Sequence, residues 1–207
     1  MAHYKLALLG FGNVGVALAE LLLRKESEIK QEYNITFKVV GLVTGRHGLA
    51  IDPSGVDLPQ ALSLVNAGKT LSHLNQNPAS TTVEDFIQNC DADVIFEATP
   101  VNYESGQPAV DYIHSALESG MHVITANKGP VVHAYQSLTT LAESKNVKFH
   151  FESTVMDGAP IFGLFRETLP ASQIHGFRGV LNSTTNVILT CMENGESFDE
   201  AVAYAQS

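Results

Sequence analysis

The sequence predicts an α/β fold in which helices cover both faces of a parallel sheet. Short apolar runs alternate with longer segments whose apolar residues recur every three to four positions. The first run, Lys5–Leu9, shows no polar alternation, which is typical of a strand that is covered on both sides. Because neighbouring parallel strands need a crossover connection, the alternation of strand and helix predicts a doubly wound sheet.

The elements are expected in a regular order over the first 152 residues. After the first strand, Val14–Lys25 has apolar residues at helical spacing, and Phe37–Val43 is rich in valine and aromatic residues, as strands are. Residues 44–80 are less regular, with several proline and glycine turns. Further strands are expected at Asp93–Glu97, Met121–Thr125 and Val147–Glu152, and further helices at Leu58–Ala67, Val83–Asn89, Gln107–Ser119 and Val131–Ser144.

The pattern changes after this region. Ile161–Thr168 is expected to be a helix, Ile174–Leu181 a strand and Ser183–Glu193 a helix. We therefore expect two domains. Residues 1–155 form the sheet domain, and residues 156–207 form the start of a second α+β domain that is apparently truncated.

Composition excludes several functional classes. The net charge of −10, with no run of Lys or Arg, argues against partners such as nucleic acid or an anionic membrane surface. No apolar stretch approaches the ~20 residues that span a bilayer. Cys90 and Cys191 are far apart and fit neither a disulfide framework nor a zinc site. The amino terminus lacks the pattern of a cleavable signal, so we expect a cytoplasmic protein.

A glycine-rich turn follows the first strand directly. It reads Gly10, Phe11, Gly12, Asn13, Val14 and Gly15, which fits G-x-G-x-x-G between a strand and a helix. The first glycine allows the tight turn, the second lets the backbone approach a pyrophosphate, and the third lets helix and strand pack closely. Alone, such glycines also occur in ordinary turns. In this setting they predict a Rossmann-type domain in which these six residues bind a nicotinamide dinucleotide.

Three further residues are candidates for contacts with this cofactor. Arg46 stands after the second strand, where an NAD-selective domain usually has a carboxylate, and it could face the 2′-phosphate of NADP or simply be solvated. Thr99 follows a strand and could contact the nicotinamide or cap the next helix. Lys128 also follows a strand, and it could favour developing negative charge beside the substrate or lie on the surface.

Four blocks of the sequence together resemble homoserine dehydrogenase. They are the glycine turn, residues 125–130 (TANKGP), residues 151–161 (FESTVMDGAPI) and residues 179–189 (GVLNSTTNVIL). The resemblance implies reversible hydride transfer between L-homoserine and L-aspartate 4-semialdehyde, with NADP or NAD as cofactor, in threonine and methionine biosynthesis. It also implies that Lys128 is catalytic and that the complete protein is a homodimer.

The resemblance further implies a site for a monovalent cation in some members. The matching positions here are Glu152, Val155, Asp157 and Ala159, although Asp157 stands where a small residue is common and is equally suited to cap a helix. Family members continue past the equivalent of Ser207 with residues for substrate binding and proton transfer. We therefore expect this chain to be a fragment that does not turn over homoserine by itself.

Two other functions remain open on the sequence alone. One is another amino-acid dehydrogenase on the same fold, which only fold analogy supports. The other is a non-catalytic NAD(P)-binding or redox-sensing module, which the first half of the chain would also fit. The polar run Ser183-Thr184-Thr185-Asn186 before an apolar helix favours a substrate-facing segment, although helix capping explains it equally well.

Overall fold

The computed structural model describes residues 1–156, 158–169 and 171–207. The chain divides into two compact units, Met1–Phe151 and Glu152–Ser207. In the described residues, no helix is both long and apolar enough to cross a membrane.

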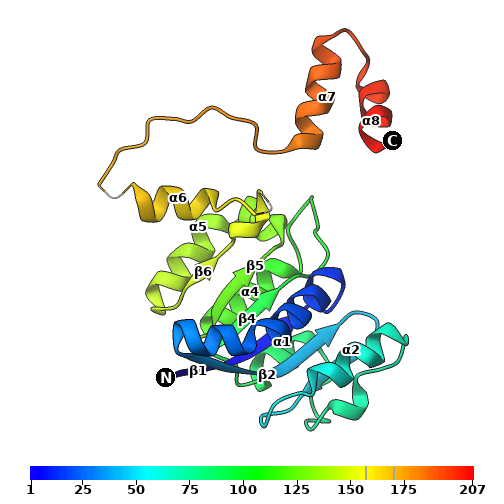
Figure 1. Ribbon diagram of the computed structural model, residues 1–207, viewed down its shortest axis with the longest axis vertical. Coiled ribbons are helices and arrows are strands. Elements are labelled where there is room, and N and C mark those ends of the chain that lie inside the picture. The colour runs from blue at the N-terminus through cyan, green and yellow to red at the C-terminus, as the bar shows by residue number, and fades with distance from the viewer. Residues whose placement is uncertain (157, 170) are drawn as a thin grey trace. The chain divides into compact units, whose positions relative to one another are not determined.

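The first unit is built on a six-stranded sheet with the order β3-β2-β1-β4-β5-β6 (Figure 1). All neighbouring strands run parallel except β2 and β3, which are antiparallel. The strands are β1 (Ala2–Leu9), β2 (Ile35–Thr44), β3 (Gly48–Ile51), β4 (Val94–Glu97), β5 (His122–Thr125) and β6 (Phe149–His150). The predicted doubly wound α/β fold is confirmed. Strand β3 was not predicted, because four residues after a turn carry too little periodicity to indicate a strand.

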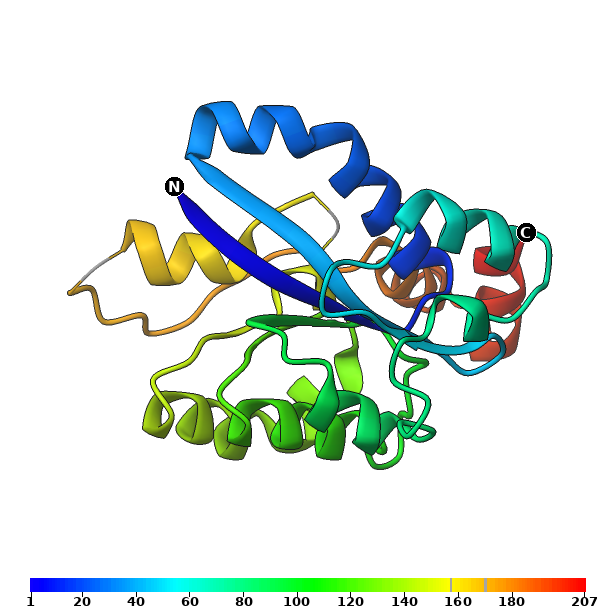
Figure 2. The same cartoon turned by 90° about the horizontal axis from the view of Figure 1, so that it is seen from below.

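Helices cover both faces of this sheet (Figure 2). Helices α1 (Asn13–Tyr33) and α2 (Leu58–Asn66) lie on one face, and α3 (Val83–Asn89), α4 (Ala109–Glu118) and α5 (Lys128–Ser144) lie on the other. A short 3-10 turn, η1, spans Ser72–Leu74. Helix α1 continues past the predicted end at Lys25, because residues 26–33 are mostly helix-forming polar residues without an apolar stripe. It ends at Asn34, whose φ of 56° is left-handed.

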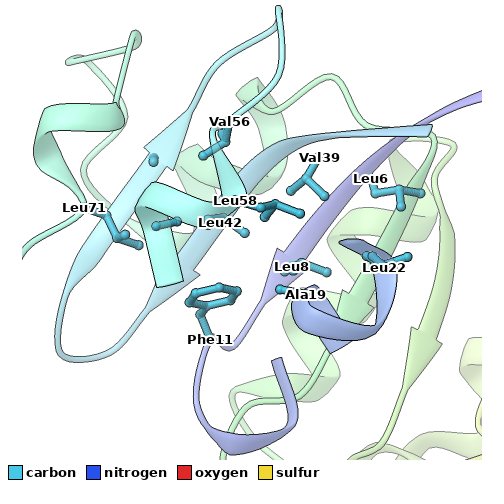
Figure 3. Close-up of a cluster of buried hydrophobic side chains, with 12 residues drawn as sticks. Leu6, Leu8, Phe11, Ala19, Leu22, Val39, Leu42, Val56, Leu58 and Leu71 are labelled. Atoms are coloured by element: carbon cyan, nitrogen blue, oxygen red, sulfur yellow. The ribbon is translucent and has the colours of Figure 1, made fainter. Parts of the chain in front are cut away.

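The core beneath α1 and α2 fixes the position of the glycine turn. Leu8 of β1, Leu42 of β2 and Ala19 of α1 are buried together (Figure 3). The side chain of Phe11 joins this cluster and is only 2% exposed. Phe11 was predicted to bind cofactor, but its ring points into the core, so only its backbone is left to face a ligand.

The second unit contains η2 (Glu152–Thr154), α6 (Ile161–Thr168), α7 (Ser183–Glu193) and α8 (Phe198–Gln206). Helices α6 and α7 have the predicted bounds. The expected strand at Ile174–Leu181 is wrong: the segment is irregular and pairs with no strand among the described residues, and a strand needs a partner for its backbone hydrogen bonds. In α6, α7 and α8 only Cys191 and Ala201 are buried.

Candidate functional site

The glycine turn after β1 has one open position between two closed ones. Gly10 has a φ of +99°, and a Cβ there would lie 2.5 Å from the carbonyl oxygen of Ala98. A Cβ on Gly15 would lie 2.2 Å from the carbonyl oxygen of Gly10. A Cβ on Gly12 would meet nothing within 4 Å. The turn thus needs Gly10 and Gly15 for its own packing and leaves free space above Gly12.

The amino terminus of α1 lacks the groups that usually satisfy a helix start. Its N-cap is Gly12, which offers no side-chain hydrogen bond, and the first turn contains no acidic residue. By contrast, side chains cap α2, α3, α7 and α8; these are Asp57, Thr82, Asn182 and Ser197. Free N–H groups and the positive end of the helix dipole together make this terminus a suitable site for a phosphate. Asn13 and Val14 are exposed beside it.

The turn after β2 carries no carboxylate. The hydroxyl oxygen of Thr44 accepts hydrogen bonds from the backbone N–H of Arg46, at 3.0 Å, and of His47, at 2.7 Å. These bonds fold the turn, and the side chain of Arg46 is exposed and forms no ion pair with any described residue. The guanidinium is therefore available to an anionic group.

A buried polar network joins the ends of β4 and β5. Glu97, the last residue of β4, is 1% exposed, and its Oε1 accepts hydrogen bonds from the backbone N–H of Thr99 at 2.7 Å and from its hydroxyl at 2.5 Å. Its Oε2 accepts a hydrogen bond from the hydroxyl of Thr125 at 2.5 Å. The amide of Asn127 donates to the carbonyl oxygen of Thr99 at 3.2 Å. The turns after the two strands are thus tied together.

Helix α5 begins at this network. The side chain of Asn127 caps it by accepting a hydrogen bond from Gly129 N–H at 3.0 Å. Lys128 is the first helical residue, is exposed, and forms no ion pair in the described part of the chain. Gly129 packs tightly, since a Cβ there would lie 2.9 Å from the Cα of Gly106.

The parallel strands therefore bring the glycine turn, Thr99 and Lys128 to one edge of the sheet. Gly10 packs against Ala98, and Thr99 bonds to Asn127, so the three loops are neighbours. A separate shallow groove along α5, lined by residues between 132 and 144, holds none of the predicted residues. The sequence places Glu97, Thr125 and Asn127 in two polar strand ends where a cofactor or substrate would lie, but only Thr99 and Lys128 of these segments were given roles. A carboxylate at the end of a buried strand, two residues before a threonine, is the pattern from which a role for Glu97 could have been predicted.

The predicted cation residues lie in the second unit. Both carboxylate oxygens of Glu152 accept hydrogen bonds from the start of α6, from Phe162 N–H at 2.7 Å and Gly163 N–H at 2.9 Å. The side chains of Val155 and Ala159 are apolar, so these residues have only backbone carbonyls to offer. Asp157 lies outside the described residues. Among the residues that the structure describes, no three or more His, Cys, Asp or Glu side chains are grouped to hold a metal ion.

Comparison with known proteins shows the family. The family model described as "Homoserine dehydrogenase, NAD binding domain" matches residues 10–152, and the one described as "Homoserine dehydrogenase" matches residues 160–207. An NAD(+)-dependent homoserine dehydrogenase of Pseudomonas canavaninivorans is 40% identical over 100% of this chain and 59% of its own length. A homoserine dehydrogenase of Methanocaldococcus jannaschii is 38% identical over 96% of this chain and 59% of its own length.

Solved structures that resemble this chain are also homoserine dehydrogenases. A hyperthermophilic archaeal homoserine dehydrogenase in complex with NADPH has a TM-score of 0.78 and 28% identity, over 99% of this chain and 60% of that chain. The chain thus spans about three fifths of the length of these relatives. The resemblance inferred from the four sequence blocks is confirmed, and the chain belongs to the homoserine dehydrogenase family.

Proposed function

We propose that this chain supplies the dinucleotide site of an enzyme that interconverts L-homoserine and L-aspartate 4-semialdehyde. The observation that carries the proposal is the uncapped start of α1 above the open position at Gly12, on the same edge of the sheet as Thr99 and Lys128. In a doubly wound sheet, dinucleotides bind at this edge, across the point where the strand order reverses. Here that point lies between β1 and β4.

The two halves of the site have different tasks. The glycine turn and the start of α1 bind the pyrophosphate, and Arg46 faces the adenosine ribose. Thr99 and Lys128 lie on the β4–β5 side, toward the nicotinamide. When bound, the nicotinamide accepts or donates the hydride. Lys128 stabilises the negative charge that develops on the substrate oxygen as the alcohol loses its proton.

The residues near Glu152 could supply oxygen ligands to a monovalent cation, although both carboxylate oxygens of Glu152 already accept hydrogen bonds from α6. Glu152 offers carboxylate lone pairs, and backbone carbonyls at positions 155 and 159 would complete an oxygen-only donor set. We include the cation, a homodimer of the complete protein and a cytoplasmic location in the proposal. Exposed Leu189, Phe198 and Tyr204 support further association of α7 and α8, and the free thiols of Cys90 and Cys191 suit a reducing compartment.

The direct test is homoserine-dependent reduction of NADP+ and NAD+ by the full-length protein, followed by absorbance. Lys128→Ala should lower turnover by about 100-fold or more, since positioned groups that manage a proton or its charge contribute that much. Its unfolding midpoint should stay near that of the parent, because exposed substitutions change stability little.

The matched control is Lys145→Ala, which removes an exposed lysine that pairs with Glu118 on the same unit. It should keep full turnover. Tight dinucleotide binding without any homoserine oxidation would instead favour a non-catalytic binding module.

A further inference from the structure

The Glu97 carboxylate is buried at the candidate site without a cation. Its residue is 1% exposed, and no Lys, Arg or His among the described residues pairs with it. Burying a carboxylate is costly unless hydrogen bonds replace the lost water. All of the donors that it has here are neutral groups of the two adjoining turns.

These donors come from both sides of the site. Oε1 accepts from Thr99 N–H at 2.7 Å, from Thr99 Oγ1–H at 2.5 Å and, at 3.5 Å, from the side-chain amide of Asn127. Oε2 accepts from Thr125 Oγ1–H at 2.5 Å. Each oxygen of the carboxylate thus accepts at least one short hydrogen bond from a neighbouring turn. One carboxylate therefore determines the conformation of the Thr99 turn.

The network continues into the helix that carries Lys128. Thr125 Oγ1 accepts a hydrogen bond from Asn127 N–H at 2.9 Å, and Asn127 Oδ1 accepts one from Gly129 N–H at 3.0 Å. Glu97 thus orients Asn127 both directly and through Thr125, and Asn127 holds the first turn of α5. No described hydrogen bond of this network reaches the start of α1 or Arg46.

We propose that Glu97 is a positioning residue for the nicotinamide half of the site, one that acts through Thr99 and Asn127 and is itself too buried to touch the substrate. This inference rests on the proposed function. Under this proposal, the two halves of the dinucleotide depend on different residues. Binding of the adenosine diphosphate half depends on the glycine turn, and binding of the nicotinamide half depends on Glu97.

The test compares each dinucleotide with its fragment that lacks nicotinamide, by titration calorimetry on the 207-residue chain. The probes are NADP+ with 2′-phospho-ADP-ribose and NAD+ with ADP-ribose. The unmodified chain should bind each dinucleotide more tightly than its fragment. Glu97→Gln should reduce dinucleotide affinity by about tenfold, because the amide nitrogen that replaces one carboxylate oxygen cannot accept a hydrogen bond from a threonine of the adjoining turns. Fragment affinity should change less than about twofold, which is well under ~1 kcal/mol, because the network of Glu97 forms no described hydrogen bond with the start of α1 or with Arg46.

A second variant keeps the test decisive if Glu97→Gln folds poorly. Thr99→Val removes only the hydroxyl donor of a half-buried residue and should lower dinucleotide affinity in the same selective way. Glu118→Gln, at the last residue of α4, breaks an exposed ion pair with Lys145 and should leave all four affinities unchanged.

The outcomes separate the two ideas. If the unmodified chain binds neither dinucleotides nor fragments, the proposed function fails. Fragments that bind the parent well, combined with equal losses for fragment and dinucleotide in Glu97→Gln and Thr99→Val, would show a purely structural role and overturn the inference. Unchanged dinucleotide affinity in both variants would overturn it as well.

Discussion

Among single residues, Gly12 and Gly15 of the glycine turn differ in what an added methyl group would meet. At Gly12 a Cβ has free space, whereas at Gly15 it would lie 2.2 Å from backbone. Gly12→Ala should therefore fold normally and lose dinucleotide affinity, because the methyl group occupies the space for the pyrophosphate. Gly15→Ala should lose about 1–3 kcal/mol of stability, the usual effect of overpacking.

Urea unfolding and calorimetric titration of both variants check this prediction. The two substitutions are matched controls for each other, since both add one methyl group to the same turn. If Gly12→Ala destabilised the chain as much as Gly15→Ala, the open space above Gly12 would not be a ligand site.

The turn after β2 leads to a prediction about the preference of the protein for NADP or NAD. The turn after β2 has the exposed guanidinium of Arg46 where NAD-selective domains place a carboxylate. NADP should therefore bind at least as well as NAD, and Arg46→Asp should reverse the order. The relatives differ in what their names state, since one is NAD(+)-dependent and another was solved with NADPH.

Parallel titrations of both cofactors decide the point. Arg24→Asp, which changes an exposed charge on α1, controls for the altered net charge. A clear preference of the unmodified protein for NAD would contradict the role of Arg46.

Among the elements, α3 and the residue that follows it, Cys90, pack closely on β2, where a Cβ on Gly41 would lie 3.2 Å from the Cβ of Cys90. Cys90 is 0% exposed, and burial raises the pKa of its thiol to about 11. The thiol is neutral in the folded chain up to that pH, while in the unfolded chain it ionises near pH 9. The stabilising contribution is therefore complete below about pH 9 and is lost as the pH rises toward 11.

Stability should fall across this window by up to about 1.4 kcal/mol per pH unit relative to Cys90→Ala. Urea unfolding of both proteins at pH 8 and pH 10 measures the difference. The pKa of Lys5 is raised by its hydrogen bond to Asp91. Because Lys5 is present in both proteins, its effect on stability cancels when the two are compared. Parallel pH profiles for the two proteins would show that the thiol is solvated in solution.

At the scale of the whole chain, the two units differ in how much apolar surface they bury. The sheet unit has a core on each side of β1 and β2, whereas α6, α7 and α8 bury only Cys191 and Ala201 among their described residues. Val187 and Leu189 of α7 are exposed. A helix with an exposed apolar face needs a further layer to pack on.

We therefore expect the 207-residue chain to bind dinucleotide but not to oxidise homoserine. The relatives that it matches are longer. The chain spans 59% of the length of the Pseudomonas canavaninivorans protein and 59% of the length of the Methanocaldococcus jannaschii protein. Calorimetry and an absorbance assay on one preparation of verified mass test both halves of the statement. Oxidation at the rate of the full-length protein would refute it.

The features that could be predicted from the amino-acid sequence are local ones. A continuous apolar run predicted most of β1, and the alternation of strand and helix predicted the parallel sheet. The spacing of Gly10, Gly12 and Gly15 predicted the dinucleotide turn, because such signals lie within one strand, one helix or one turn. The four sequence blocks were specific enough to indicate the family.

Features that depend on residues far apart in the chain could be seen only in the folded protein. In the fold, the ring of Phe11 points into the core, and Ile174–Leu181 has no strand partner among the residues that the structure describes. A hydrogen bond also joins Glu97 to Thr125 across neighbouring strands. Burial and hydrogen bonding between distant segments leave no period in a single sequence, so only packing shows which carboxylate lies beneath the site and which residues it orients.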